Sequence, residues 1–397
     1  MSVICLDGGD PDYFNAPLSQ GLLPNIKTML GEGYYAVANG VIPSFTNPNN
    51  VSIITGTPPS GHGISGNFFL NPETGEEVMM NEPEFLRQES ILAAFSRQGA
   101  KIAIVTAKDK LLKLLSHQVK GGIKFSSERA DKCTKVANGL TDCLAYVGRP
   151  LPDVYSADLS LFVLEAGIKI LERERPDLMY LSLTDYIQHK YAPGSKEAND
   201  FYQALDLAFG RLTKAGAIIG ITGDHGMNDK SHPDGSPKVI YLQDLLDRKI
   251  GPGKTRVILP ITDPYVVHHG ALGSFATLFF RNGLTATSEI IDFIKILPGV
   301  EQVMTREEAV NRYQLPGDRI GDLIVISDKG TVIGTSRASH DLSQLNGMRL
   351  RSHGGLADRK VPFILSRPLN AEYSALAGSR LLYNYDIFDF ALNGVRN

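Results

Sequence analysis

The sequence predicts an α/β fold: a doubly wound, largely parallel sheet flanked by helices, with a small α+β cap inserted into it. Short apolar runs suited to buried strands alternate along the chain with helical patterns. A stretch near the carboxyl terminus has a different texture, with strand and helix patterns that repeat in a new order. Acidic residues also follow several of the apolar runs, as expected where an open α/β sheet binds ligands at its strand ends.

The expected strands of the main sheet share a length of about five residues and a nearly continuous apolar composition, which is typical of strands buried on both faces. They cover 2–6, 101–105, 178–183, 217–221 and 362–365. The helical patterns between them cover 25–30, 90–96, 160–173 and 197–212.

The cap is predicted from residues 265–340. Its expected elements are a strand at 274–280, a helix at 288–297, a strand at 301–304, a helix at 307–313 and a strand at 322–327. The catalytic core would then comprise residues 1–264 and 341–397.

Composition excludes several classes of function. A formal net charge of −3 with 21% charged residues gives no electrostatic basis for binding nucleic acid or an anionic membrane. No apolar run is long enough to span a bilayer, and the chain enters its first strand without a signal-peptide pattern, so we expect a cytoplasmic protein. The three cysteines (Cys5, Cys133 and Cys143) are an odd number without C-x-x-C spacing, which argues against a disulfide framework and against a thiolate zinc site.

Asp224 and His225 lie in the segment Thr222-Gly-Asp-His-Gly-Met227, directly after a predicted buried strand. A carboxylate beside an imidazole is a good pair of metal ligands. Taken alone, the pair fits a strand-to-turn corner equally well, since Asp is a common turn former. Asp7, which ends the first strand, has the same two interpretations.

Asp185 follows another predicted strand, and His189 stands four residues later, so a helical turn would place both side chains on one face. His353 precedes a Gly pair that allows a loop to approach a site closely. Three carboxylates and three imidazoles at one sheet edge are costly unless metal ions neutralise them. Oxygen and nitrogen ligands without thiolate favour two Zn²⁺ ions, with Mn²⁺ or Fe²⁺ as alternatives.

Thr46 precedes Pro48 and a helical pattern at 51–54, so it is a candidate helix N-cap. A hydroxyl at a helix N-terminus also lies in a positive electrostatic potential. If it binds a metal ion as well, its alkoxide becomes accessible near neutral pH. Thr46 is therefore our candidate nucleophile.

The ordered set Asp7, Thr46, Asp185-x-x-x-His189, Asp224-His225-Gly226 and His353 resembles the alkaline phosphatase superfamily, in its nucleotide pyrophosphatase/phosphodiesterase-like branch. The resemblance implies an alkaline phosphatase-like fold with two metal sites. One would comprise Asp7, Thr46, Asp224 and His225, and the other Asp185, His189 and His353. The first metal would then hold the Thr46 nucleophile.

Five local stretches, at 46–50, 61–67, 106–110, 222–230 and 263–270, are similar to the phosphonoacetate hydrolases of this branch. This similarity implies that Lys108 and Lys110 hold a substrate carboxylate and that Asn67 contacts a phosphonate. Without it, the two lysines would be interpreted as solvated residues near a helix start.

The implied reaction cleaves the carbon–phosphorus bond of phosphonoacetate, a small anionic phosphonate, to acetate and phosphate. Attack by Thr46 would give a phospho-threonine, and direct attack by a metal-held hydroxide is the alternative. A phosphodiesterase or nucleotide pyrophosphatase with the same two metals is the rival activity, and a metal-stabilised binding domain is the rival without catalysis. A homodimer is one candidate assembly.

Overall fold

The computed structural model describes residues 1–262 and 270–396. Its centre is a seven-stranded sheet in the order β2-β17-β8-β1-β7-β5-β6. The strands are β1 (Ser2–Leu6), β2 (Tyr34–Asn39), β5 (Ile102–Thr106), β6 (Ile123–Ser126), β7 (Leu178–Ser182), β8 (Ile219–Gly223) and β17 (Lys360–Leu365). All neighbouring pairs are parallel except those of β17, which runs antiparallel to β2 and β8. The predicted fold class is confirmed.

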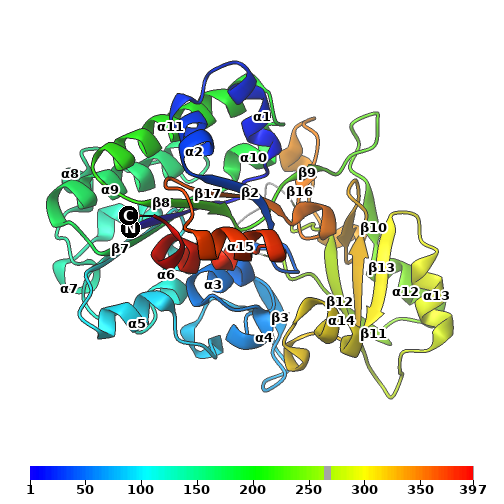
Figure 1. Ribbon diagram of the computed structural model, residues 1–397. Helices are drawn as coiled ribbons and strands as arrows, with labels where there is room; N and C mark the ends of the chain where they lie inside the picture. Colours follow the sequence, from blue (N-terminus) through cyan, green and yellow to red (C-terminus); the bar gives the residue numbers. More distant parts are fainter. Residues whose placement is uncertain (263–269, 397) are drawn as a thin grey trace.

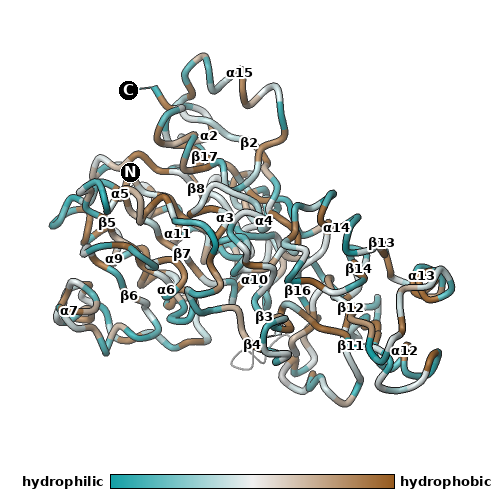
Figure 2. The backbone as a smooth tube through the Cα atoms, turned by 90° about the horizontal axis from the view of Figure 1, so that it is seen from below, coloured by the Kyte–Doolittle hydropathy of each residue, from teal (hydrophilic) through white to brown (hydrophobic). Residues whose placement is uncertain are grey.

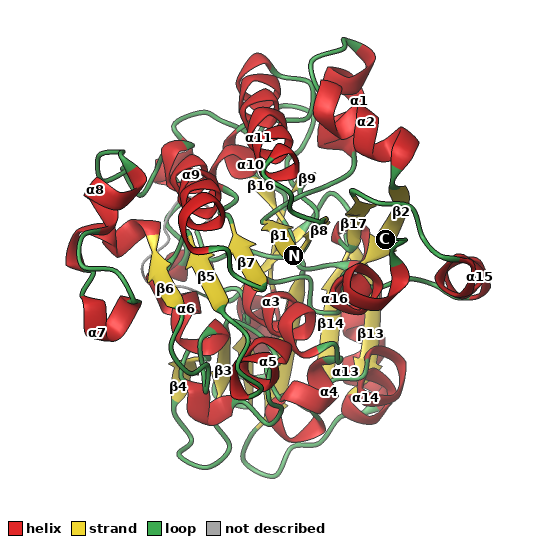
Figure 3. Ribbon diagram, turned by 60° about the vertical axis from the view of Figure 1, so that its left-hand side comes forward, coloured by secondary structure: helices red, strands yellow, loops and turns green. Residues whose placement is uncertain are grey.

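Helices cover both faces of this sheet (Figures 1 and 3). One face carries α1 (Asp12–Ser19), α2 (Pro24–Glu32), α9 (Asp158–Glu174) and α11 (Lys196–Lys214), and the other carries α3 (Thr46–Thr55), α5 (Ile91–Arg97), α6 (Asp109–Leu115) and α16 (Ile387–Asp389). Strand alternation divides the side chains of β1 between two hydrophobic cores: Ile4 and Leu6 pack on the first face, Val3 and Cys5 on the second. Burial on both faces explains the continuous apolar runs that predicted these strands.

Four adjacent strands bring candidate functional residues to one edge of the sheet. Asp224 follows β8, Asp7 follows β1, Asp185 lies shortly after β7, and Lys108 lies shortly after β5. Because these strands are parallel, their carboxyl ends meet at the same edge. The antiparallel direction of β17 brings its beginning, and the segment that precedes it, to that edge as well.

A second, antiparallel sheet lies beside the first in the order β11-β12-β14-β13 (Figure 1). Its strands are β11 (Thr255–Ile258), β12 (Phe275–Phe280), β13 (Val300–Thr305) and β14 (Leu323–Ser327), and its helices are α12 (Leu242–Ile250), α13 (Ser288–Lys295) and α14 (Arg306–Tyr313). The elements expected within 265–340 occur in the predicted order. β11 joins this sheet from outside that range, and the division into core and inserted cap stays a prediction.

Hydrophobic segments follow the strands of both sheets, whereas hydrophilic segments lie mainly at the periphery (Figure 2). The second sheet has a separate core of its own, which includes Phe275, Leu278 and Ile324. None of the helices within 1–262 and 270–396 combines the length and the apolar character needed to cross a membrane.

The cysteine count argued against a disulfide framework, yet the structure contains one disulfide. Cys133 and Cys143 are joined by a disulfide, with their Cα atoms 5.9 Å apart, and Cys5 is buried as a free thiol. The short spacing of 10 residues carries no motif, and the turn of chain between β6 and α9 brings the two side chains together.

Candidate metal centre and substrate pocket

Asp185 and His189 are joined by a short helix, as the spacing predicted. Asp185 is the N-cap of α10 (Tyr186–Lys190), and His189 lies one turn later on the same face. Asp185 Oδ2 is 2.8 Å from His189 Nε2. The local backbone therefore presents one carboxylate and one imidazole together.

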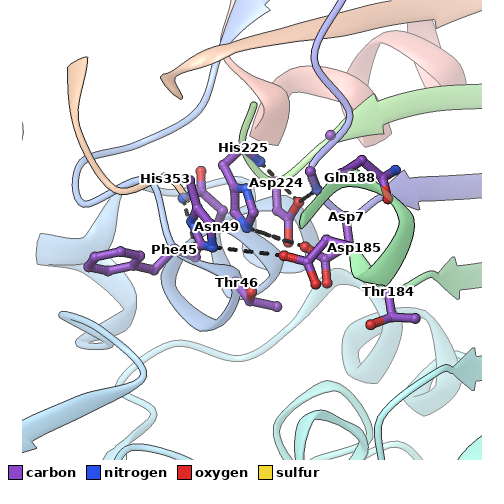
Figure 4. A network of polar contacts seen from close by, with 12 residues as sticks. Asp7, Phe45, Thr46, Asn49, Thr184, Asp185, Gln188, Asp224, His225 and His353 are labelled. Atoms are coloured by element: carbon purple, nitrogen blue, oxygen red, sulfur yellow. Dashed lines mark hydrogen bonds and ion pairs between the residues drawn. The ribbon is translucent and has the colours of Figure 1, made fainter. Parts of the chain in front are cut away.

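His353 and His225 come from distant parts of the chain and meet face to face (Figure 4). His353 follows β16 (Arg351–Ser352), which pairs with β9 (Asn228–Asp229), shortly after His225. The two rings are stacked with centroids 3.5 Å apart. His353 Nε2 lies 3.8 Å from Asp185 Oδ2, and His225 Nε2 lies 3.2 Å from Asp7 Oδ1.

All three imidazoles make the same kind of hydrogen bond to the backbone. In each, Nδ1 lies within hydrogen-bond distance of a backbone carbonyl oxygen: Arg351 O for His189 (2.8 Å), Gly226 O for His225 (2.9 Å) and Ser44 O for His353 (2.7 Å). Since a carbonyl only accepts, Nδ1 must carry the proton in each ring. The Nε2 lone pairs are thereby left for coordination, the arrangement found in metal-ligating histidines.

The donor atoms form two groups, each with its atoms within 4.8 Å of one another. One is Asp185, His189 and His353, which is the second of the two predicted ligand sets. The other is Asp7, Asp185 and His225, so Asp185 takes part in both. Asp224, expected in the first set, is not a member of either group, although its Oδ2 is 3.8 Å from His225 Nε2.

Asn50 is a residue that the sequence reasoning missed as part of this site. Its Nδ2 donates to Asp224 Oδ2 (3.1 Å), while its Oδ1 accepts from Tyr180 OH (2.8 Å) and Ser182 Oγ (3.0 Å). The two hydroxyl donors fix which end of the amide faces the carboxylate. A signal was present, because Asn50 lies four residues after Thr46 and so on the same helix face.

Burial and crowding displace the pKa values of the acids. Burial, and then the carboxylates of Asp185 and Asp224, raises the pKa of Asp7 well above its usual range. Burial and Asp185 raise the pKa of Asp224 to about 7. Burial acts in the same direction on Asp185, but His189 and His353 outweigh it and hold its pKa well below its ordinary value. The cluster thus contains more buried negative charge than its side chains neutralise.

Two atoms of the cluster also lack hydrogen-bond partners. Asp7 Oδ1 and His225 Nε2 are buried, and neither has a hydrogen-bond partner among the described residues. An unpaired polar atom in the interior is costly. A divalent cation would satisfy both atoms, and the donor set of carboxylate oxygens and imidazole nitrogens suits zinc. The residues present therefore fit the metals that the sequence predicts.

A small pocket opens beside the cluster. It is lined by Asp7, Thr46, Asn47, Asn67, Lys108, Lys110, Leu111, Leu183, Thr184, Asp185, His189, Ile261 and His353. Asp224 and His225 lie beneath this lining and are fully buried. All ten predicted site residues thus gather in one region, eight of them at the pocket wall.

Thr46 lies next to the acidic cluster (Figure 4). The prediction that it caps the helix was wrong: Phe45 is the N-cap of α3, and Thr46 is the first helical residue. Its hydroxyl still stands at the positive end of the helix, where the first N–H groups have no intrahelical partners.

Lys108 and Lys110 form the cationic part of the wall. Lys108 is the N-cap of α6, and its carbonyl oxygen accepts from Thr106 Oγ1 (2.8 Å), which fixes the turn after β5. Burial, and then the ammonium of Lys108, lowers the pKa of Lys110 to about 8. Two ammonium groups on one half-buried wall favour an anionic ligand.

Asn67 is oriented by the backbone of α3. Its Oδ1 accepts from the backbone N–H of Asn47 (2.9 Å), and its side chain lines the pocket. The amide oxygen is thereby committed to the protein, and the other end of the side chain is the NH₂ group, a hydrogen-bond donor.

A sequence profile of the type I phosphodiesterase/nucleotide pyrophosphatase family matches residues 1–355. The chain is also similar to the phosphonoacetate hydrolase of Sinorhizobium meliloti 1021. The structure of that enzyme with phosphonoformate has 51% sequence identity, a TM-score of 0.93, and coverage of 98% of this chain and 94% of that one. The structure with phosphonoacetate has 50% identity and a TM-score of 0.92, with the same coverage of both chains.

Two further matches have lower sequence identity. Murine ectonucleotide pyrophosphatase/phosphodiesterase 5 has 18% identity and a TM-score of 0.65 over 98% of this chain and 93% of that one. An uncharacterized pyrophosphatase/phosphodiesterase of Schizosaccharomyces pombe is 24% identical over 267 residues, which are 62% of this chain and 47% of that protein. The chain thus spans about half the length of that relative. The stretch 263–270 that contributed to the predicted resemblance lies, except for Gly270, outside the described residues. The profile match and the overall similarity show that the chain belongs to the type I phosphodiesterase/nucleotide pyrophosphatase family.

Proposed function

We propose that this protein hydrolyses the carbon–phosphorus bond of phosphonoacetate, giving acetate and phosphate. The observation that carries the proposal is the 51% identity, over 98% of the chain, to a phosphonoacetate hydrolase. The pocket supports it independently, because one wall offers a candidate dimetal cluster and another offers two lysines. A small dianion with phosphonate at one end and carboxylate at the other matches that division of charge.

The residues that would hold two Zn²⁺ ions are those of the two predicted sets. Asp7, Thr46, Asp224 and His225 would hold one ion, and Asp185, His189 and His353 the other. When bound, the ions would neutralise charge on the phosphonate oxygens and make an alkoxide or hydroxide accessible near neutral pH. Asp185 belongs to both donor groups, so its negative charge would act on both ions.

Thr46 is proposed as the nucleophile. Its position at the first residue of α3 favours an alkoxide, because the helix dipole and free N–H groups stabilise negative charge there. Thr46 Oγ1 would form a bond to phosphorus as the carbon–phosphorus bond breaks, and hydrolysis of the phospho-threonine would then release phosphate. The hydroxyl proton must leave during attack, and the neighbouring carboxylates are the groups able to accept it.

Lys108 and Lys110 are proposed to bind the substrate carboxylate. The electron pair of the broken bond remains on the CH₂ carbon, which is adjacent to that carboxylate. Two ammonium groups beside the carboxylate oxygens would stabilise the charge as an enediolate, and protonation of the carbon then gives acetate. Asn67 is proposed to donate its amide N–H to a phosphonate oxygen and so to fix the other end of the substrate.

The test is phosphate release from a panel containing phosphonoacetate, other phosphonates, a phosphomonoester and a phosphodiester, with metal content measured on the same preparation. We expect phosphonoacetate to be the best substrate and two zinc ions to be bound per chain. A preference for the diester or for a nucleotide would replace this proposal with the rival activity of the family. Protein purified without metal and not activated by zinc would contradict both.

A further inference from the structure

Lys230 is a fully buried lysine that lies outside the pocket wall. Both its side chain and that of Asp358, with which it forms an ion pair, are 0% exposed. Its Nζ donates to Ser274 Oγ (2.8 Å) and Lys329 O (3.0 Å), and it lies 3.2 Å from Asp358 Oδ2. Ser274 and Lys329 both fall within the range predicted for the inserted cap. One ammonium group thus connects three separate segments.

A gain in folding stability is not a sufficient explanation for the buried pair of Lys230 and Asp358. The free energy needed to desolvate two charges can exceed the free energy gained from their attraction. A buried ion pair is therefore weak evidence that the pair stabilises the fold. Burial lowers the pKa of Lys230 even though Asp358 opposes the shift. A specific structural role is therefore the better explanation for placing a lysine here.

Asp358 also forms hydrogen bonds with the two segments that carry the candidate metal ligands His225 and His353. Its Oδ2 accepts from the N–H of Gly355 (3.0 Å), two residues beyond His353. Its backbone carbonyl accepts from the N–H of Gly226 (2.7 Å), the residue after His225. Its Oδ1 accepts from Asn228 Nδ2 (2.6 Å) on the same segment as His225.

Ser274, which lies in the range predicted for the inserted cap, also forms a hydrogen bond with the His353 segment. The backbone N–H of Ser274 donates to the carbonyl oxygen of His353 (2.9 Å), and its hydroxyl donates to Thr331 O (2.8 Å). Lys230 therefore contacts two sets of hydrogen bonds. The set around Asp358 reaches the segments of both His225 and His353, and the set around Ser274 reaches the His353 segment. His225 and His353 are the two imidazoles whose stacked rings belong to different donor groups.

We propose that Lys230 is a positioning residue, which fixes the His225 and His353 segments against the inserted cap so that both imidazoles can bind metal. The inference rests on the dimetal site of the proposed function. It does not depend on which phosphorus compound is the substrate.

The test compares Lys230→Met with Lys329→Met. The first removes the ammonium group from the interior with little change of length. The second removes a charge from an exposed lysine that gives only its carbonyl oxygen to the same contact. Zinc affinity and stoichiometry are measured by chelator competition and elemental analysis, and folding is measured by circular dichroism of the metal-free proteins.

We expect Lys230→Met to keep the circular dichroism spectrum and to lose about tenfold or more in zinc affinity, and Lys329→Met to match the wild type. Ser274→Ala, which removes one partner of the ammonium without changing charge, should weaken zinc binding by a smaller factor. It provides the decisive measurement if Lys230→Met does not fold. Wild-type zinc affinity in a folded Lys230→Met variant would overturn the inference. If Lys230→Met does not fold, wild-type zinc affinity in Ser274→Ala would overturn it.

These measurements can fail independently of the proposed function. A wild-type protein that binds two zinc ions but does not cleave phosphonoacetate would contradict the proposed reaction and leave the role of Lys230 intact. A wild-type protein that binds no zinc would overturn both.

Discussion

The imidazole rings of His225 and His353 are stacked face to face, with their planes inclined by 7°. Each Nδ1 is directed to a backbone carbonyl, so the Nε2 atoms face the carboxylates: Asp7 for His225 and Asp185 for His353. Burial, and then the neighbouring rings of His225 and His189, lowers the pKa of His353 well below its usual value. The stack is therefore suited to neutral, metal-binding imidazoles.

His353→Ala should affect both donor groups. It removes a donor from one group and the stacking partner of a donor in the other, so we expect zinc affinity to fall by about tenfold or more. Chelator competition measures the loss. His232→Ala, at an exposed loop position, is the control and should bind zinc as the wild type does. Two unchanged zinc affinities in His353→Ala would refute the ligand assignment.

Thr46→Ala should fold and retain much of its metal while losing about 10³-fold or more in turnover, because it removes the proposed nucleophile. Thr46→Ser should keep measurable turnover, since it retains a hydroxyl at the same position. Rapid quenching and mass spectrometry of the wild type should detect phosphate on Thr46. Near-normal turnover by the alanine variant would instead support direct attack by water.

Lys108→Ala and Lys110→Ala should each reduce kcat/KM for phosphonoacetate by about 10- to 100-fold, the usual range for loss of a charge-assisted hydrogen bond. Hydrolysis of an activated phosphodiester, which has no carboxylate, should change much less. Lys113→Ala is a matched control on the same helix, because that exposed lysine pairs with Glu82. Equal losses on both substrates would argue against carboxylate binding.

The pKa of about 8 for Lys110 predicts a pH dependence. Only the protonated amine attracts a carboxylate, so binding is strongest below that pKa and weakens as the pH rises through it. The KM for phosphonoacetate should therefore increase above about pH 8. In Lys110→Arg the increase should move to higher pH, because guanidinium stays charged. A KM in the wild type that is flat to pH 10 would count against Lys110 as a substrate ligand.

Asn50→Ala should weaken metal binding through Asp224. The variant loses the 3.1 Å hydrogen bond that orients the Asp224 carboxylate, and it leaves the hydroxyls of Tyr180 and Ser182 without their acceptor. We expect zinc affinity to fall by about tenfold. Asn50→Asp should be worse, because it adds a negative charge beside a carboxylate whose pKa is already raised. Unchanged zinc binding in both variants would remove Asn50 from the site.

The central strands were predictable because burial on both faces requires an uninterrupted apolar run, as in β1 and β7. The two strands at the edges of the sheet were missed. β2 alternates exposed and half-buried side chains over much of its length, and β6 contains Lys124. β2 is only partly buried and Lys124 interrupts β6, so neither strand has a continuous apolar pattern.

The candidate ligands were also predictable, since Asp7, Asp185 and Asp224 carry a local signature at strand ends. Asn50 contacts Asp224, and Lys230 contacts Asp358, in each case far away in the sequence. No local sequence pattern predicts such a contact. The same reasoning applies to the disulfide of Cys133 and Cys143, which depends on how the intervening turn folds. The order of the elements within 274–327 was predicted, whereas the place of β11 in the second sheet depends on its pairing with β12.

β17 is the last of the seven strands to be synthesised, yet it lies between β2 and β8. Until residue 365 has left the ribosome, β2 lacks the neighbour that joins it to the sheet, and one long edge of β8 stays open. Open strand edges of this kind favour misassociation, so the chain should be most prone to aggregate before β17 has been synthesised. The same insertion places His353 at the edge of the sheet, so the candidate metal centre can be complete only after β17 has joined β8.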